Sequence, residues 1–235
     1  MWKLMKLEWK KNRIGKYVKK AVILALMLSL FLFAFVYLGI ANDPDTGVPD
    51  AATGSGTISA SVEMFTSMSF LILSSVMLSS FLVSAYKNGT MDLMFSYPIR
   101  RQKILASGML AVWIFNFAAL VLTKLAVYGC ILWGSFFRKP AFPIDFDMTG
   151  PDFYIQLIVK AAVIVTMSFI SLFIGLAAKS SKAAIVSSFV LILLTQANIG
   201  DYTMAGNAVF SFGLTSVSLV FAFFSIWKAE TADLM

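Results

Sequence analysis

Six apolar runs separated by polar segments make up most of this chain. They cover about residues 21–40, 62–86, 104–137, 153–177, 183–197 and 208–227. A helix needs about 20 apolar residues to cross the hydrocarbon core of a bilayer. The pattern therefore predicts an all-α integral membrane protein with six transmembrane helices. The third run is too long for one upright span, so it either tilts, breaks near Gly129 or Gly134, or continues as an outer-surface segment.

The first 20 residues predict an amphipathic helix that lies in the membrane interface. Lys3, Lys6, Lys10 and Arg13 recur at steps of three and four, which places them on one stripe of a helix. Leu4, Leu7, Ile14 and Val18 form an apolar stripe, and Trp2 and Trp9 are typical anchors at headgroup depth. Anionic lipid is the expected partner. A cleaved signal peptide is the alternative, but the basic region and the apolar run are both too long.

Composition supports the membrane assignment. Hydrophobic residues make up 59% of the 235 residues, charged residues only 13%, and the mean hydropathy is +0.84. Soluble domains have about a quarter of their residues charged. The net charge of +7 does not indicate a nucleic-acid partner, because the basic residues cluster at the ends of apolar runs.

The distribution of those basic residues predicts the topology. The segment 41–60 carries three aspartates and no basic residue, whereas fifteen of the 19 Lys and Arg residues fall in the segments assigned to the inside. Only Arg138 and Lys139 fall in segments assigned to the outside, and Lys124 and Lys160 fall within apolar runs. The positive-inside rule then places both termini in the cytoplasm.

A basic, amphipathic segment of about 20 residues, 86–105, joins the second and third apolar runs, and we call it the hinge. A short helix from about Thr90 to Ser96 would gather Leu93, Met94 and Tyr97 on one side. Pro98 would stop that helix, and basic residues follow at once. The pattern predicts an element that docks on a surface or partner; the alternative is a solvated loop whose charge fixes topology.

The hinge resembles the first cytoplasmic loop of type-2 ATP-binding-cassette (ABC) exporter permeases. The resemblance is carried by Gly89, Thr90, Leu93, Met94, Tyr97, Pro98, Ile99, Arg100 and Ile104. The layout of an N-terminal amphipathic helix and six spans also fits. The chain departs from the family in having Lys87 and Asn88 where acidic residues commonly precede the Gly-Thr pair, and Gly108 near a position that is often lysine.

This resemblance implies an architecture and a function. A connecting helix over residues 1–20 would precede a permease domain over 21–235, with a coupling-helix loop at about 87–103. The loop would dock on a separate ATPase subunit through Gly89, Thr90, Asp92, Leu93, Met94, Tyr97, Pro98, Arg100 and Arg101. Such permeases work in the bacterial plasma membrane as dimers, identical or not, and export peptides, antimicrobials or other amphipathic substrates. ATP and Mg²⁺ would bind to the partner ATPase.

The residue inventory gives no indication of enzymatic chemistry. There is no histidine, so imidazole bases are absent, and the single cysteine, Cys130, excludes an intramolecular disulfide. Gly15, Lys16 and Tyr17 lack the glycine-rich loop and hydroxyl residue of a phosphate-binding motif. We therefore predict a non-enzymatic chain without its own metal or cofactor. The rival hypotheses are a non-transporting sensor or assembly subunit and, less favoured, an ion-coupled carrier.

Three ionisable residues fall within the apolar runs and are functional candidates by default. Glu63 and Lys160 lie near the outer ends of their spans, where they can extend to the headgroups. Lys124 lies deeper, so it either reaches the outer interface through a tilted helix or faces the interior. Ser75 and Ser79 either support close helix packing or line a polar path. The candidate substrate path consists of Ser75, Ser79 and Lys124.

Overall fold

The computed structural model describes residues 2–37, 57–84, 101–137, 146, 148–196, 198–199, 202–203 and 208–231. Within these ranges the chain is helical, which confirms the predicted class. The exception is a pair of two-residue antiparallel strands, β1 (Asn198–Ile199) and β2 (Tyr202–Thr203). This small ladder lies in the predicted connection between the last two apolar helices.

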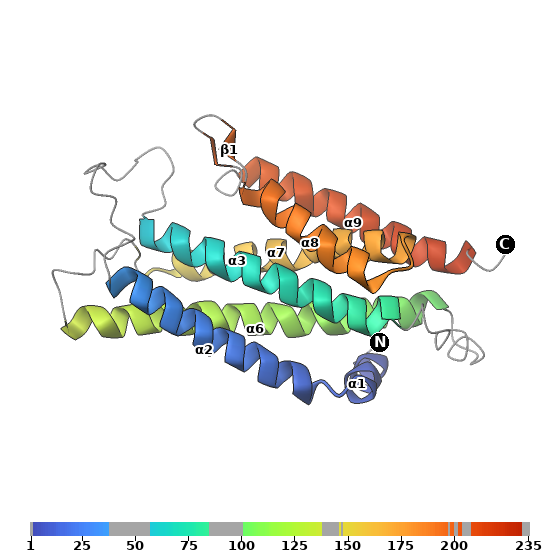
Figure 1. Cartoon of the computed structure of the whole chain (residues 1–235), viewed down its shortest axis with the longest axis horizontal. Coiled ribbons are helices and arrows are strands. Elements are labelled where there is room, and N and C mark those ends of the chain that lie inside the picture. The colour runs from blue at the N-terminus through green and yellow to red at the C-terminus, as the bar shows by residue number, and fades with distance from the viewer. Residues whose placement is uncertain are drawn as a thin grey trace.

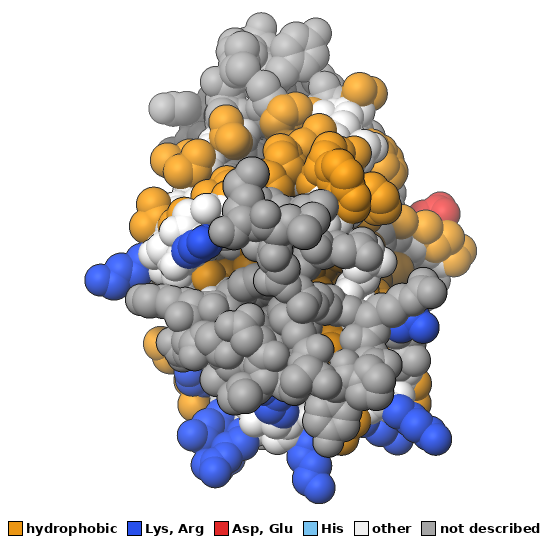
Figure 2. All heavy atoms as spheres, turned by 90° about the vertical axis from the view of Figure 1, so that its right-hand side faces the viewer, with side chains coloured by type: hydrophobic (Ala, Val, Ile, Leu, Met, Phe, Trp, Pro, Cys, Tyr) orange, Lys and Arg blue, Asp and Glu red, His pale blue; other side chains and the backbone are white. Residues whose placement is uncertain are grey.

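Six helices run along the long axis of the molecule in alternating directions (Figure 1). They are α2 (Gly15–Tyr37), α3 (Thr57–Leu78), α6 (Arg101–Phe137), α7 (Pro151–Ala177), α8 (Ser181–Gln196) and α9 (Ala208–Thr231). The helix α1 (Trp2–Lys11) crosses their direction at one end. The α7–α8 turn and the end of α9 lie at that same end, where Lys and Arg side chains surround the bundle (Figure 2). We call it the basic end and the opposite one the far end.

Five of these helices are long and apolar enough to cross a membrane. They are α2, α3 with its continuation, α6, α7 and α9. The chain is therefore a multi-pass membrane protein. Helix α8 has 16 residues and extends about 24 Å at 1.5 Å per residue, less than the roughly 30 Å of a hydrocarbon core. The fifth predicted span is thus a helix too short to cross an ordinary bilayer upright, and six complete spans stay a prediction.

The long third run forms one continuous helix. Helix α6 has 37 residues, or about 55 Å, and passes through Gly129 and Gly134 without interruption. The break considered at these glycines is therefore wrong. A helix of this length exceeds the bilayer core and accommodates the excess by tilt or protrusion. Near its far end, Trp133 and Phe136 are among the most exposed large apolar side chains.

The N-terminal segment differs from the single helix expected over residues 1–20. Helix α1 ends at Lys11, Arg13 has a left-handed backbone with a φ of 48°, and α2 begins at Gly15. A left-handed residue interrupts a right-handed helix. Consequently Ile14 lies in the turn, and Val18 belongs to the first turn of α2, so neither extends the apolar stripe of α1.

The described helices divide into an enclosed group and a peripheral group. In the apolar window of α3, 61% of the residues are buried, against 17% in α9. Helices α6 and α7 resemble α3, whereas α2 presents a broad apolar surface. Lipid tails can cover such surfaces because they are as apolar as the side chains. The polar contacts that could serve a function therefore concentrate among α3, α6 and α7.

Helix α3 ends in a short π-helical turn, η1 (Ser79–Val83), in which the Ser84 N–H donates to the Ser79 carbonyl. Such turns insert an extra residue into a helix and frequently occur at functional sites. Here the turn directly precedes the hinge. It packs against α6, α7 and α8 at the basic end.

Candidate functional site

The predicted ATPase-docking residues lie almost entirely outside the described residues. These are Gly89, Thr90, Asp92, Leu93, Met94, Tyr97, Pro98 and Arg100. Arg101 is the first residue of α6. The predicted docking helix and its partner therefore stay predictions, and the site is built from the elements on either side of the hinge.

The two elements that flank the hinge pack tightly against each other. A β-carbon added to Gly108 of α6 would come within 2.8 Å of Leu82 Cδ2 in η1. Around this contact lies an apolar cluster that includes Phe81, Leu105 and Leu172. Helix α7 also packs closely on both neighbours, because a β-carbon on Gly175 would lie 2.5 Å from the Ala184 Cβ of α8 and 3.2 Å from Val83 Cγ2 of η1. The region beside the hinge is therefore densely packed.

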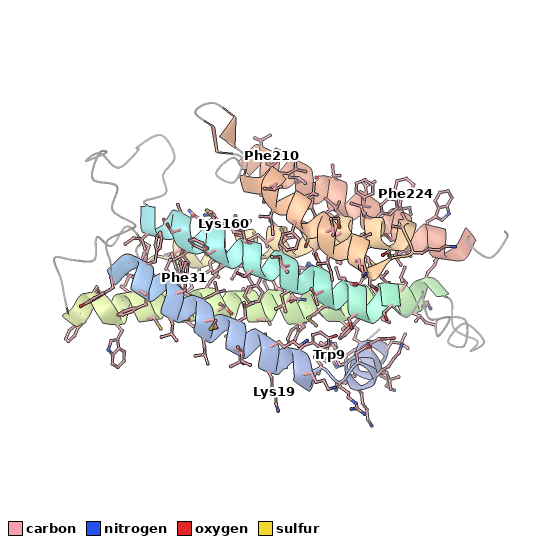
Figure 3. The ribbon with its side chains drawn as sticks, in the orientation of Figure 1. Trp9, Lys19, Phe31, Lys160, Phe210 and Phe224 are labelled. Carbon is pink, nitrogen blue, oxygen red and sulfur yellow. The ribbon has the colours of Figure 1, made fainter. Side chains whose placement is uncertain are left out.

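Helix α1 is fixed to this region by a tryptophan. The Trp9 indole N–H donates to the Ala111 carbonyl of α6 at 3.1 Å, and Figure 3 shows Trp9 where α1 meets α6. Trp2 packs edge-on against Trp9, and the Lys6 ammonium lies 5.7 Å from the Trp2 ring centre. The two tryptophans thus contact each other in addition to serving as interfacial residues. The periodicity alone did not indicate this contact.

The remaining predicted interfacial residues are exposed. Lys3 and Lys10 extend from α1, and Arg13 lies in the turn after it. The face that α1 buries instead carries Met5 and Glu8. Leu7 is exposed and Leu4 half-buried, and the burial of their stripe in the membrane interface stays a prediction.

Glu8 is a buried acid outside the membrane-spanning helices. Burial raises the pKa of its carboxyl group above the ordinary value of 4.5, while the nearby Lys11 ammonium and the hydrogen bond donated by Asn12 lower it. The Asn12 side-chain N–H donates to Glu8 Oε2 at 3.2 Å, and Lys11 Nζ lies 4.0 Å from the same oxygen. The carboxyl group is thus held on the inner side of α1, turned toward the bundle.

A charged pair joins α3 to α6 toward the far end. Lys124 Nζ lies 2.6 Å from Glu63 Oε2. The Lys124 side chain is fully buried, whereas 20% of the Glu63 side chain remains exposed. The structure therefore supports the interior orientation of Lys124, and Glu63 turns toward its partner helix as well as the surface. Lys160, in contrast, is exposed on α7.

The two predicted path serines connect α3 and η1 to α7 and α8. The Ser75 and Ser171 hydroxyls are 2.8 Å apart, and both side chains are buried. The Ser79 hydroxyl donates to the Ser181 carbonyl at 3.1 Å. Both serines serve helix packing in this arrangement. Ser75, Ser79 and Lys124 are not brought together in a single contact, and their role as a path stays a prediction.

Two buried polar atoms, one on α3 and one on α6, lack a hydrogen-bond partner in the part of the chain that the structure describes. They are the Ser74 hydroxyl and the Asn116 side-chain oxygen. The Asn116 amide nitrogen donates to the Val112 carbonyl at 3.0 Å and approaches Met77 Sδ at 3.4 Å. Unpaired buried polar atoms are uncommon in native structures, so they indicate either hydration or a second arrangement of the helices.

Sequence reasoning missed Glu63, Ser171 and Asn116 as members of this interior network. Opposite charges on antiparallel neighbouring spans, both nearer the far end, were the available signal for the Glu63–Lys124 pair. No comparable signal pointed to Ser171 or Asn116, because serines and asparagines in apolar helices are common packing residues. Across the described ranges, no group of three or more His, Cys, Asp or Glu residues is arranged to hold a metal ion.

Comparisons with known proteins give one distant relationship. The chain is 24% identical over 234 residues to the uncharacterised protein YcbO of Bacillus subtilis (strain 168). The alignment covers 98% of this chain and 99% of that protein, so the similarity extends over the whole length of both. No family model and no solved structure matches the chain.

Proposed function

We propose that this chain is the transmembrane permease subunit of an ABC exporter. It would work with a second permease and with separate ATPase subunits in a bacterial plasma membrane, both termini facing the cytoplasm. The cargo would be a peptide, an antimicrobial or another amphipathic molecule. The proposal rests on the resemblance of the hinge and on the arrangement of the helices around it.

The observation that carries the proposal is the tight packing of the two hinge flanks. Gly108 of α6 and Leu82 of η1 contact each other close to the hinge. Densely packed interfaces transmit displacement because they cannot be compressed. An ATPase that pushed on the hinge would therefore move α3 and α6 as a unit. The movement would not be lost in a loosely packed connection.

The first two helices provide a second connection to the same place. The Trp9 indole fixes α1 to α6, and the Tyr17 hydroxyl lies 2.7 Å from the Ser80 hydroxyl of η1. Movement of η1 or α6 would consequently be passed to α1 and α2. This supports a role for the N-terminal helix as a connecting element and not only as a membrane anchor.

The unpaired interior atoms support a bundle that changes its arrangement. Leaving a buried polar atom without a partner destabilises a protein by about 1–3 kcal/mol. A rearrangement of the helices around α3 would expose the Ser74 hydroxyl and the Asn116 oxygen to water or to a polar cargo group. Ser75 lies next to Ser74 in α3 and contacts Ser171 of α7, so the proposed path would follow α3 between α6 and α7.

Purification from the native host in mild detergent tests the proposal. We expect a stoichiometric ATPase with nucleotide-binding motifs to accompany the chain, as identified by mass spectrometry. Its reproducible absence, with the chain folded and intact, would contradict the exporter proposal.

A hinge variant sharpens this test. Replacing Leu93, Met94 and Tyr97 with alanine should release the ATPase and uncouple ATP hydrolysis from transport. A matched control, Phe212→Ala/Val220→Ala/Phe223→Ala, truncates three apolar side chains of α9, two of them about half exposed and one about two-thirds exposed. The control should retain the ATPase. If both variants retain the ATPase equally, the hinge does not dock the ATPase, and its basic residues serve only to fix the topology.

The buried charged pair favours an ion-coupled carrier as the second candidate, because ionisable groups within membranes often serve proton or ion pathways. Transport in proteoliposomes separates the two candidates. An exporter should require the ATPase and ATP and should not respond to an ion gradient alone. A carrier should respond to an ion gradient alone and should lose transport when Glu63 is replaced.

A further inference from the structure

A hollow of about 490 Å³ lies at the basic end between the end of α1 and the beginning of α2. Four cationic side chains line it: Lys10, Arg13, Lys16 and Lys19. The Trp9 ring forms part of its wall, and its position is fixed by the hydrogen bond to Ala111. The hollow is therefore open and largely apolar in its lining, with one fixed wall and four cationic side chains around it.

The backbone turn explains why these cations converge. The left-handed conformation of Arg13 redirects the chain between two helices that cross, so that Lys10 and Arg13 approach the first turns of α2. Lys16 and Lys19 are three residues apart and therefore share one side of α2. Figure 3 shows Lys19 extending outward from α2, away from the bundle.

The described part of the chain supplies no counter-charge to this hollow. None of its four cations forms an ion pair with an acid in the described ranges, where the ion pairs are Lys11 with Glu8 and Lys124 with Glu63. Glu8 is the acid of α1, and its carboxyl group is turned to the buried side. Grouped like charges repel one another, so an anion bound among them would stabilise the turn.

The surface next to the hollow is apolar and exposed. Along α2 it consists of Val18, Val22, Ile23, Leu26, Met27 and Leu30. Gly15 begins α2, where the Lys16, Tyr17 and Val18 amides already donate to the Arg13 and Ile14 carbonyls, so the positive charge that faces a ligand comes from the side chains. A ligand matching both surfaces has an anionic phosphate at one end and hydrocarbon chains at the other.

We propose that the hollow is a binding site for an anionic phospholipid of the adjacent leaflet. The phosphate and the anionic headgroup would lie among Lys10, Arg13, Lys16 and Lys19, and the acyl chains would lie along the exposed face of α2. This site goes beyond general attraction of a basic helix to a charged membrane, because it assigns one lipid molecule to a defined hollow. It holds whether or not the chain is a transport subunit.

Native mass spectrometry of the purified full chain tests this site. The protein is titrated in detergent with phosphatidylglycerol or with phosphatidylcholine of the same acyl chains, and retained lipid is counted. Phosphatidylglycerol should be retained at about one molecule per chain in preference to phosphatidylcholine. Thermal unfolding should show the same preference as a higher Tm, since a ligand that binds only the folded state stabilises it.

A pair of variants with equal charge distinguishes the hollow from diffuse attraction. Arg13→Gln/Lys16→Gln should weaken phosphatidylglycerol binding about thirtyfold, because each cation near an anionic lipid contributes roughly fivefold. The control Lys3→Gln/Lys182→Gln removes the same charge from exposed positions at the same end that do not line the hollow. Its binding should be nearly unchanged. Equal weakening in both variants would overturn the site.

Competition with inorganic phosphate distinguishes a bound lipid from a bound free anion. Competition by inorganic phosphate at a concentration comparable with that of the lipid would assign the hollow to a soluble phosphate and overturn the lipid proposal. No competition is expected, because phosphate lacks the contact with α2.

Gly15→Leu provides a test without any change of charge. Gly15 lines the hollow and a β-carbon there meets nothing within 4 Å, so we expect the larger side chain to occupy part of the hollow. Phosphatidylglycerol retention should fall in this variant even if the double glutamine variant does not fold. Unchanged retention with Gly15→Leu would overturn the assignment.

Discussion

Lys124 and the lysines of the α1–α2 hollow are the same residue type in opposite surroundings. Lys124 is fully buried and forms an ion pair with Glu63 of the neighbouring helix at 2.6 Å. Lys16 and Lys19 are exposed, and no described acid pairs with them. An isolated charge inside a membrane is costly, so the chain itself supplies the partner there. At the bundle edge, where headgroups are available, the counter-charge is left to the surroundings.

Breaking the buried pair should have the largest effect. Glu63→Gln leaves Lys124 charged and fully buried, which is expected to lower the free energy of unfolding by about 3–5 kcal/mol. Lys124→Met should be less severe because 20% of the Glu63 side chain is exposed and can be hydrated. Denaturation in mixed micelles measures both values. An equal or reversed order would contradict the assigned burial.

Replacing both partners of the pair gives the control. Glu63→Leu/Lys124→Met should recover most of the lost stability, since an apolar pair can substitute for a buried ion pair without an unpaired charge. A double variant as unstable as Glu63→Gln would mean that the pair is needed for packing as well as for charge.

Two glycines provide the next largest contrast between the closed interior and the open hollow. Gly175→Ala places a methyl group 2.5 Å from the Ala184 Cβ and 3.3 Å from the Ala184 Cα, so α7 and α8 must separate. Overpacking of this kind destabilises by about 1–3 kcal/mol. Gly15→Ala meets no atom within 4 Å and should leave stability unchanged or slightly raised. Thermal unfolding of the two variants compares them directly.

The serine pair should contribute less than either contact. Ser75→Ala removes the contact with the Ser171 hydroxyl, which also donates to the Ser168 carbonyl and so retains a partner. Hydrogen bonds between helices in membranes contribute about 0.6 kcal/mol on average. A double-mutant cycle with Ser171→Ala measures the coupling between the two hydroxyls, and a value near zero would show that the contact adds no stability.

The docking of α1 should depend weakly on pH through Glu8. Since the pKa of its carboxyl group is raised in the folded state, protonation favours the docked helix. Docking is therefore strongest at low pH and weakens as the pH rises from 4.5 through the raised pKa. Hydrogen exchange of the α1 amides at several pH values measures this. Glu8→Gln should remove the dependence; if it persists there, another group is responsible.

Hydropathy predicted the helices well because burial in lipid imposes length and apolarity on every span. Helix α7 covers Pro151–Ala177 where residues 153–177 were expected, and α9 begins at the expected Ala208. The end of α1 was less predictable. The basic stripe continues through Arg13 in sequence, and periodicity does not register a single left-handed residue that interrupts it.

The contacts of the candidate site were largely beyond sequence reasoning. Periodicity assigns a residue to a side of its own helix, whereas the pairing of Glu63 with Lys124 depends on which turns of α3 and α6 lie opposite each other. The same limitation applies to Ser75 and Ser171. The docking residues of the hinge stay predictions, because residues 85–100 lie outside the described ranges.

Because α6 is uninterrupted, a rotation at one end of the helix is passed along its axis to the other end. Trp9 holds it at Ala111, and Glu63 holds it at Lys124, 13 residues and about 20 Å further along its axis. A continuous hydrogen-bonded helix does not swivel between two such points. Rotation of α6 about its axis at the basic end would therefore move Lys124 away from Glu63. The ion pair thus opposes rotation of the whole helix.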